Sequence, residues 1–581
     1  MTNPSIKWLY STYTDAHGRT YVYTFYNKWD PVKRQSRIAQ RAHVGRLCPQ
    51  TGEVRLGKKF LSTHPEFEGK TWFYEDNELV QRDPEIIKEE LQNAQQTQWR
   101  NDCVSVGLGW AAWKQAEKIG LLKDLEEVFG ATNARHLLAL AIYQLDCAGA
   151  MMNFEDWLAM NWLPKVQPLS GQRISELLAQ VDQAKMDTYY SKRYNRIVER
   201  YEELLKQNAQ SANTPMAIAL DSTSISTYSD TICDAAYSHA KQDAHLKQVN
   251  LALCTDYLTG DICYAYQSEG SITDVALFPN LLMRMQMNGI DLAKTLVITD
   301  RGYASLYNTQ KLYNLEIPFI QGVRVIEDSI KEKFEKYDAS FRSIAFIDSR
   351  LGVAARSFQD QWRADTDSGQ VTIKGYLHLY HNPTKASREQ MNLLKAVDSM
   401  IELHNSGARY DYDKWRQVSR FITENQGQFS RNLKALECYA QSMGRFVIRS
   451  NAVSDPFVAL SLYRMRNVVE VGFNQFKNQT GGSRMYATQS SYVGKLFIHT
   501  LAQAIRMTML MKIKRSDLPG NPLPKDSLEK AFWQMKKLMA DKPIGRNAWV
   551  VKEVPRKTRN LFEALELPVP TRVIKPKLFR N

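Results

Sequence analysis

The stretch MAIALDSTS, residues 216–224, contains a run of apolar residues that ends in an acid, Asp221. A short apolar run of this kind predicts a buried β-strand that ends at the acid. The stretch TLVITDRGY, residues 295–303, repeats the pattern and its apolar run ends in Asp300. In open α/β sheets, ligands bind at the carboxyl ends of the strands, so we expect Asp221 and Asp300 to stand side by side.

The segments around these two strands predict a sheet with crossover helices. We expect strands in HLKQVNLALCTD, DICYAYQSEG and IPFIQGVRV, and helices in TDVALFPNLLMRMQMNG and ASLYNTQKLYN. The resulting order over residues 215–325 is β-β-β-α-β-α-β. Parallel strands need a crossover connection, and both helices fall where one is needed. The predicted fold class is therefore α/β, in a chain long enough for several domains.

Further along, YRMRNVVEVGFNQFK, residues 463–477, predicts one amphipathic helix. Asp455 or Ser454 can cap this helix, and Pro456 suits its first position. Spacings of three, four and seven residues place four polar side chains on one helical face, namely Tyr463, Arg466, Glu470 and Lys477. A solvated, salt-bridged face is the alternative interpretation of this polar stripe, although an arginine before a glutamate is the weaker i,i+4 orientation.

Glu470 is the natural third acid beside Asp221 and Asp300, because it lies in the middle of the predicted helix and within the polar stripe. Three clustered carboxylates cannot all remain ionised without cations, so the arrangement predicts a divalent metal site. Oxygen-rich ligation favours Mg²⁺ or Mn²⁺. Two such ions about 4 Å apart can activate a nucleophile and stabilise the leaving oxygen of a phosphodiester. For each acid alone, a cap or turn residue is the alternative.

Three blocks of the chain resemble the catalytic blocks of the DDE transposases of bacterial insertion sequences. The blocks are LDSTS, TDRGY and Y-x2-R-x3-E-x6-K, and the last is similar to the YREK signature of the insertion-sequence-four superfamily. The resemblance implies a ribonuclease-H-like core (β-β-β-α-β-α-β-α) with a large insertion before the last catalytic helix. It also implies that Asp221, Asp300 and Glu470 are the metal-binding catalytic acids, with two ions per site.

The same resemblance implies contacts with DNA. Tyr463, Arg466 and Lys477 would hold the DNA backbone near the cleaved phosphate, and Arg301 follows Asp300 as in the family's D-R-G block. The implied reaction is cut-and-paste transposition, in which hydrolysis frees 3′-hydroxyl ends that then join target DNA. Two ends must be handled together, so we expect a homodimer bound to inverted-repeat ends. A ribonuclease-H-like nuclease without strand transfer and a non-catalytic, transposase-derived DNA-binding regulator are the alternatives.

The charge balance agrees with a nucleic-acid partner. The formal net charge is +14, and basic residues concentrate in VKRQSRIAQRAHVGR, residues 32–46, and again in the C-terminal tail. Such patches are typical of polyanion-binding proteins, although a membrane surface or an acidic protein would also suit them. We expect the first patch to contact DNA phosphates through residues that we call the N-terminal basic tract: Lys33, Arg34, Arg37 and Arg41.

Changes in composition and in predicted secondary structure along the chain, together with the resemblance, predict six regions. They are a basic β-rich N-terminal DNA-binding region (1–80), a helical DNA-binding region (81–210), the first part of the catalytic core (215–325), an inserted domain (326–453), the second part of the core (454–515) and a basic C-terminal region for dimerisation or DNA contact (516–581). If the transposon end forms a hairpin, as in some relatives, a flipped base needs an aromatic platform. Trp415 is the preferred candidate and Trp362 the second, with packing in the insertion's own core as the alternative.

Other classes of protein are disfavoured by what the chain lacks. Its seven cysteines have no paired spacing, which argues against a disulfide framework and a zinc ribbon. It has no G-x-x-x-x-G-K-[ST] phosphate loop, so we expect no nucleotide cofactor. Its apolar runs fall short of the roughly 18 residues of a membrane span, and its N-terminus does not resemble a signal peptide. We therefore expect a cytoplasmic bacterial protein, associated with the nucleoid when bound to DNA.

Overall fold

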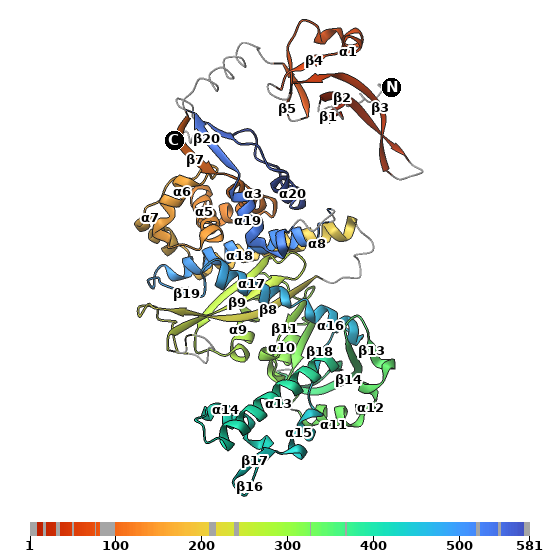
Figure 1. Cartoon of the computed structure of the whole chain (residues 1–581), viewed down its shortest axis with the longest axis vertical. Helices are drawn as coiled ribbons and strands as arrows, with labels where there is room; N and C mark the ends of the chain where they lie inside the picture. Colours follow the sequence, from red (N-terminus) through yellow and green to blue (C-terminus); the bar gives the residue numbers. More distant parts are fainter. Residues whose placement is uncertain are drawn as a thin grey trace. The chain divides into compact units, whose positions relative to one another are not determined.

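The computed structural model of the chain describes residues 8–15, 19–30, 35–48, 52–75, 77–81, 99–207, 216–237, 243, 245–325, 327–366, 369–516, 518, 523–543 and 548–574. The chain divides into two compact units (Figure 1). Unit 1 contains Met1–Cys103 and Asp541–Val550, and unit 2 contains Val104–Ala540 and Val551–Asn581.

Unit 1 is built around an antiparallel sheet in the order β1-β2-β3-β4. Its elements are β1 (Leu9–Thr14), β2 (Thr20–Asp30), β3 (Gln35–Leu47), β4 (Val54–Leu56), α1 (Lys58–Thr63), η1 (Pro65–Phe67), β5 (Trp72–Glu75) and β6 (Glu78–Gln81). Val22, Val44, Val54 and Phe60 form a small buried core. Strands predominate here, as the sequence predicts for residues 1–80.

The main helices of unit 2 come from both ends of its chain. They are α3 (Gly107–Lys118), α4 (Leu121–Phe129), α5 (Ala131–Cys147), α6 (Phe154–Met160), α7 (Gly171–Ala179), α8 (Gln183–Gln207), α18 (Tyr492–Lys514), α19 (Leu528–Lys536) and α20 (Arg556–Ala564). α5 is buried along most of its length and packs against α18. Arg193 of α8 is fully buried and pairs with Asp124 of α4 and with Asp261, which precedes a strand of the sheet. The helices between Gly107 and Gln207 share one unit with the sheet.

A ten-stranded mixed sheet gives unit 2 its mixed α/β fold, in the order β10-β9-β8-β11-β12-β18-β15-β14-β13, with β19 paired to β8. Its first elements are β8 (Ala217–Thr227), β9 (Lys247–Asp256), β10 (Ile262–Glu269), α9 (Asp274–Met287), β11 (Leu296–Thr299), α10 (Leu306–Asn314) and β12 (Phe319–Val323). β8, β9 and β10 are antiparallel, whereas β11 is parallel to β8 and β12. Strands and helices alternate along the chain as the sequence predicts for residues 215–325.

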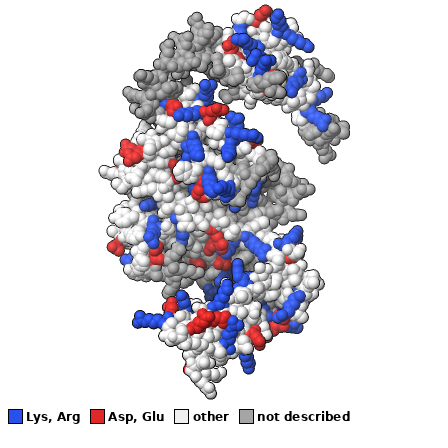
Figure 2. Space-filling view, in the orientation of Figure 1, with Lys and Arg blue, Asp and Glu red and all other residues white. Residues whose placement is uncertain are grey.

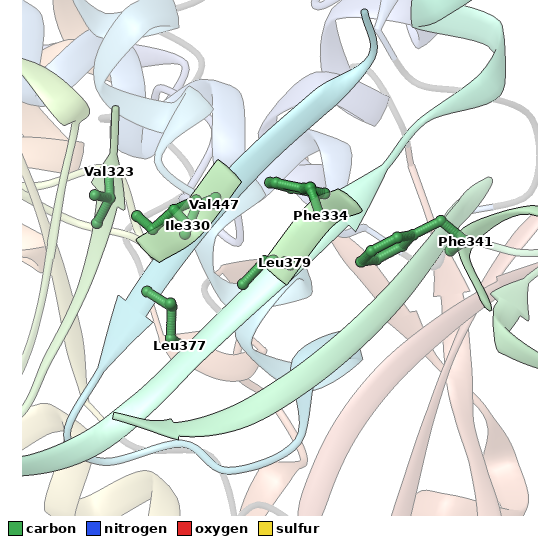
Figure 3. Close-up of a cluster of buried hydrophobic side chains, with 8 residues drawn as sticks. Val323, Ile330, Phe334, Phe341, Leu377, Leu379 and Val447 are labelled. Atoms are coloured by element: carbon green, nitrogen blue, oxygen red, sulfur yellow. The ribbon is translucent and has the colours of Figure 1, made fainter. Parts of the chain in front are cut away.

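Residues 326–453 extend this sheet. The added strands are β13 (Ile347–Asp348), β14 (Val353–Thr366), β15 (Gly369–His381) and β18 (Arg445–Ser450). β18 pairs with both β12 and β15, and Figure 3 shows Val323 of β12 beside Val447 of β18 and Ile330 of α11 (Asp328–Lys336) in one buried cluster. β12 would otherwise expose unpaired backbone groups at a sheet edge, and pairing with β18 satisfies them. The insertion is therefore not a domain separate from the core.

Part of the insertion nevertheless has its own small core. Its elements are α13 (Pro383–Asn405), α14 (Tyr412–Val418), η6 (Ser419–Phe421), β16 (Ile422–Asn425), β17 (Gln428–Arg431) and α15 (Leu433–Ala440). Val397, Met400, Phe421 and Leu436 are buried together there. This part extends away from the large sheet (Figure 1).

The shorter elements of the described chain complete the fold. They are β7 (Trp99–Ser105), η2 (Met151–Asn153), α12 (Asp338–Arg342), η5 (Ile344–Phe346), β19 (Arg484–Met485), η8 (Pro524–Asp526), β20 (Met539–Pro543), β21 (Trp549–Val551) and β22 (Val573–Ile574). Within the described ranges, no single helix is long and apolar enough to cross a membrane. Ala131–Cys147 and Met151–Met160 reach that length and composition only as a pair, which is bent by 104°.

Candidate active site

Asp221 and Asp300 lie next to each other on adjacent parallel strands. Leu220 of β8 is in register with Thr299 of β11, so the acids that follow them are neighbours, as the sequence predicts. Asp300 follows its strand and begins the short helix η4 (Arg301–Tyr303). Asp221 lies within its strand, because β8 continues past it beside β9. The prediction that this strand ends at the acid is therefore wrong.

The predicted helix over residues 463–477 is broken into segments. They are α16 (Pro456–Arg464), α17 (Asn467–Asn474) and a π-helix, η7 (Gln475–Gln479). Tyr463 lies in α16, Arg466 at the break, Glu470 in α17 and Lys477 in η7. The prediction of a single helix is wrong, because the chain forms a tight turn with i→i+3 hydrogen bonds at the break. Tyr463 and Arg466, on this turn, contact acids of the sheet.

Arg466 joins two of the three predicted acids. Its Nη1 donates to Oδ2 of Asp221 at 2.8 Å, and its Nη2 donates to Oε1 of Glu470 at 2.5 Å. The side chain of Arg466 is 13% exposed, whereas that of Glu470 is 52% exposed. The hydroxyl of Tyr463 donates to Oδ1 of Asp300 at 3.0 Å. Two residues of the polar stripe therefore contact the strand acids, which a solvated, salt-bridged helix face would not do.

Burial and charge shift the acid–base properties of these groups. Burial raises the pKa of Asp221 to about 6; the Arg466 guanidinium opposes this shift. The carboxylates of Asp300 and Asp274 add to it. Burial also raises the pKa of Tyr463, and the Asp300 carboxylate adds to the rise, so the hydroxyl remains a donor. For Arg466, burial opposes the charge, but the carboxylates of Asp300 and Asp221 outweigh it and raise the pKa.

The donor chemistry of the three acids suits Mg²⁺ or Mn²⁺, because both ions prefer carboxylate oxygens. In the part of the chain that the structure describes, however, no three His, Cys, Asp or Glu side chains are grouped closely enough to hold a metal ion. The Arg466 guanidinium instead lies between Asp221 and Glu470 and supplies the positive charge. The predicted cluster of three acids is therefore interrupted by an internal cation.

Asp274 is a further acid of this site that the sequence patterns did not single out. It lies in the first turn of α9, and its Oδ1 accepts a hydrogen bond from the hydroxyl of Ser222, the neighbour of Asp221. Its other oxygen lies over the turn after Asp300, where a Cβ at Gly302 would be 3.2 Å away. An acid in the first turn of a helix is common, since it complements the helix dipole, so sequence alone offered no distinguishing signal.

Two cations predicted for the site, Arg301 and Lys477, form no ion pair with a carboxylate in the described part of the chain. Arg301 is exposed directly after Asp300, and Lys477 is half-buried in η7. Burial lowers the pKa of Lys477.

The N-terminal basic tract is only partly described. Lys33 and Arg34 lie outside the described residues, whereas Arg37 and Arg41 are exposed on β3 of unit 1. The guanidinium of Arg41 lies 3.4 Å from the ring centroid of Tyr23. On the face shown in Figure 2, Lys and Arg side chains occur on both units and are interspersed with acidic ones.

Trp415 lies in an aromatic cluster within the insertion. Its ring centroid is 4.3 Å from that of His404 and 6.2 Å from that of Phe429, and the side chain is partly buried against the small core. This packing agrees with the alternative of a core tryptophan. The side chain of Trp362 lies outside the described part of the structure.

Comparison with known proteins identifies the family. Residues 212–504 match the family described as "Transposase DDE domain", which is 293 of the 581 residues of the chain. The chain belongs to this family. A solved structure similar to this DDE transposase is a piggyBac transposase synaptic complex with hairpin DNA, at 10% identity and a TM-score of 0.31, covering 79% of this chain and 76% of that one. No curated protein matches the chain.

Proposed function

We propose that this DDE transposase moves a bacterial insertion sequence of the insertion-sequence-four superfamily by cut-and-paste transposition. It cleaves the inverted-repeat ends by metal-dependent hydrolysis and joins the freed 3′-hydroxyl groups to target DNA. The observation that carries the proposal is the convergence of Tyr463 on Asp300 and of Arg466 on Asp221, with Glu470 on the same guanidinium. These contacts join the YREK-like segment to both strand acids, which supports a ribonuclease-H-like core.

Asp221, Asp300 and Glu470 are the residues that would hold two Mg²⁺ or Mn²⁺ ions. When bound, such ions supply Lewis acidity to the scissile phosphate and to the attacking oxygen. In the metal-free chain, the Arg466 guanidinium balances the charge of Asp221 and Glu470. Once that charge is balanced in another way, the same guanidinium can fork onto a DNA phosphate, which it binds in bidentate geometry. Tyr463 keeps the Asp300 carboxylate oriented through its hydrogen bond.

The remaining cations and units have proposed roles in binding DNA. Lys477 and Arg301 bind phosphates beside the acids, and the N-terminal basic tract contacts the phosphates of the transposon end. Residues 326–453 cover the bound end, and residues 516–581 serve dimerisation or DNA contact. Because two ends react together, a homodimer holds both ends and the target, in the bacterial cytoplasm.

The test incubates purified protein and Mg²⁺ with DNA that carries the ends of its own element, and sequences the products. Asp221→Asn, Asp300→Asn and Glu470→Gln each remove a charge without changing the shape of the side chain, so each variant should lose cleavage and keep specific end binding. Ca²⁺ should support binding without chemistry, because its looser coordination misplaces the reacting atoms. Near-normal nicking by any of the three variants would refute the assignment.

The products also separate the proposal from its alternatives. Joined molecules with the element inserted in target DNA are expected of a transposase. Cleaved ends without joined products would identify a nuclease, and bound but intact DNA in Mg²⁺ would identify a regulator.

A further inference from the structure

Lys477 lies in a π-helix whose backbone differs from the α-helix that carries Glu470. The N–H of Thr480 donates to the carbonyl of Gln475 at 3.0 Å, which is the i→i+5 bond of a π-turn. Turns of this kind are rare and are frequently found at functional sites. The wider turn changes the direction in which Lys477 leaves the helix relative to Glu470, so the conformation of η7 decides where the ammonium points.

Helix α18 contacts this region at two points that are three residues apart on both segments. At the first, Gly472 of α17 lies against Gln503, and a Cβ at Gly472 would be 2.4 Å from Nε2 of Gln503. At the second, Arg506 donates to Oε1 of Gln475 twice, from Nε at 2.9 Å and from Nη2 at 2.7 Å. The first contact brings α17 against α18, which also contacts η7. The second holds the first residue of the π-turn.

Arg506 is a buried cation that also binds two other helices. Its side chain is 2% exposed. Its Nη1 donates to the carbonyl of Leu145 in α5 at 3.0 Å, and its Nη2 donates to Oε1 of Glu529 in α19 at 2.5 Å. Burying a guanidinium is costly, and apolar residues of similar volume often give equal or greater stability. Stability alone therefore does not explain why this arginine donates two N–H groups to one glutamine oxygen. The need to hold a defined turn explains it.

We infer that Arg506 and Gln475 are positioning residues that hold the π-turn and thereby aim the ammonium of Lys477 at a DNA phosphate beside the catalytic acids. This inference rests on the proposed role of Lys477. Arg506 contacts neither DNA nor the catalytic acids, and it acts through Gln475 alone. The contact with the carbonyl of Leu145 fixes the guanidinium so that it cannot follow η7 if the turn relaxes, whereas Glu529 balances its buried charge.

Two substitutions separate positioning from general stability, because each removes one partner of Arg506. Gln475→Ala removes the acceptor on the π-turn, and Glu529→Gln removes the charged partner on α19 and leaves η7 untouched. Gln475→Glu keeps an acceptor oxygen for Arg506 and serves as the conservative rescue. Each of these three variants is made alone and in the Lys477→Ala background. The measurements are the cleavage rate at saturating DNA carrying the element's ends, thermal stability, and hydrogen exchange of the amides over residues 475–482 without DNA.

Gln475→Ala should lower the cleavage rate about tenfold, since small misplacements of a reacting phosphate are costly in rate. It should cause no further loss in the Lys477→Ala background, and it should speed amide exchange over residues 475–482. Gln475→Glu should restore cleavage to within about threefold of the wild type. Glu529→Gln should change stability without changing exchange in η7 or the effect of Lys477→Ala.

Three results would overturn the inference. The first is that Gln475→Ala leaves both the cleavage rate and the amide exchange unchanged. The second is that the losses of cleavage rate in Gln475→Ala and Lys477→Ala multiply fully in the double variant. The third is that Glu529→Gln loses cleavage rate in the same way as Gln475→Ala. In each case the proposed role of Lys477 stands, provided that Lys477→Ala alone is impaired. Full cleavage by Lys477→Ala alone would instead refute the proposed role of Lys477, and the positioning role with it.

Discussion

Replacing Asp221 with asparagine should stabilise the DNA-free, metal-free protein at neutral pH. Burial raises the pKa of this carboxyl to about 6, from an ordinary value of 3.8. The folded protein therefore holds this proton more tightly than the unfolded chain, and the contribution of Asp221 to the free energy of unfolding falls as the pH rises from about 4 to about 6. At about 1.36 kcal/mol per pKa unit, the cost of the ionised carboxylate above that range is roughly 3 kcal/mol. The side chain is only 19% exposed, so solvent screens little of this cost.

The attraction of Arg466 is already included in this balance, because it opposes the shift and does not cancel it. Urea unfolding in EDTA should show that Asp221→Asn is more stable than the wild type by roughly 3 kcal/mol near pH 7.5, and that the difference shrinks toward zero near pH 4. Glu470→Gln is the matched control, since the Glu470 side chain is 52% exposed and should gain little. Added Mn²⁺ should stabilise the wild type and not Asp221→Asn, because only the wild type keeps its ligand. A less stable Asp221→Asn protein near pH 7.5, or a difference that does not change with pH, would refute the reasoning.

Other substitutions test the DNA contacts. Lys477→Ala should reduce cleavage and strand transfer more than end binding, which many remote contacts maintain; a solvated face predicts instead full activity and a stability loss of a few tenths of a kcal/mol. Arg466→Lys should also be impaired in cleavage at saturating DNA, because an ammonium cannot reproduce a bidentate contact. Alanine at all four residues of the N-terminal basic tract should weaken binding to every sequence and flatten the log–log salt dependence by about 0.9 per lost phosphate contact; an unchanged slope in a filter-binding titration would place these residues away from DNA. If Trp415→Ala and Trp362→Ala both leave hairpin formation and strand transfer intact, neither ring is the platform for a flipped base.

Several features were predictable because they depend on residues close together in the chain. The apolar runs before Asp221 and Asp300 form adjacent parallel strands, since a buried strand needs only a short apolar segment and the crossover helix sets the direction of the next strand. Asp455 caps α16 by accepting hydrogen bonds from the N–H groups of Phe457 and Val458, both at 2.8 Å, a local interaction that a short polar side chain before Pro456 signals.

The stripe of four polar residues depends on contacts between distant segments. Their spacing matched one α-helix, but the chain breaks at Arg466 and continues through a π-turn, so the four side chains do not leave one continuous helix. No helical periodicity encodes the attraction of Arg466 for Asp221, which lies 245 residues earlier. The contact of Arg506 with Gln475 is likewise invisible in either segment alone.

The sequence by itself determined which acids and cations are available to the candidate site, because these residues and their order are properties of the chain. It also determined the strands and helices of residues 215–325, because hydrophobic runs and periodicity act over a few residues. Only the tertiary structure decided that the insertion extends the sheet through β18, that Asp274 joins the site, and that Arg466 stands between Asp221 and Glu470. These outcomes follow from pairing between segments far apart in the chain, where backbone hydrogen bonds at a strand edge and the burial of charge select one arrangement.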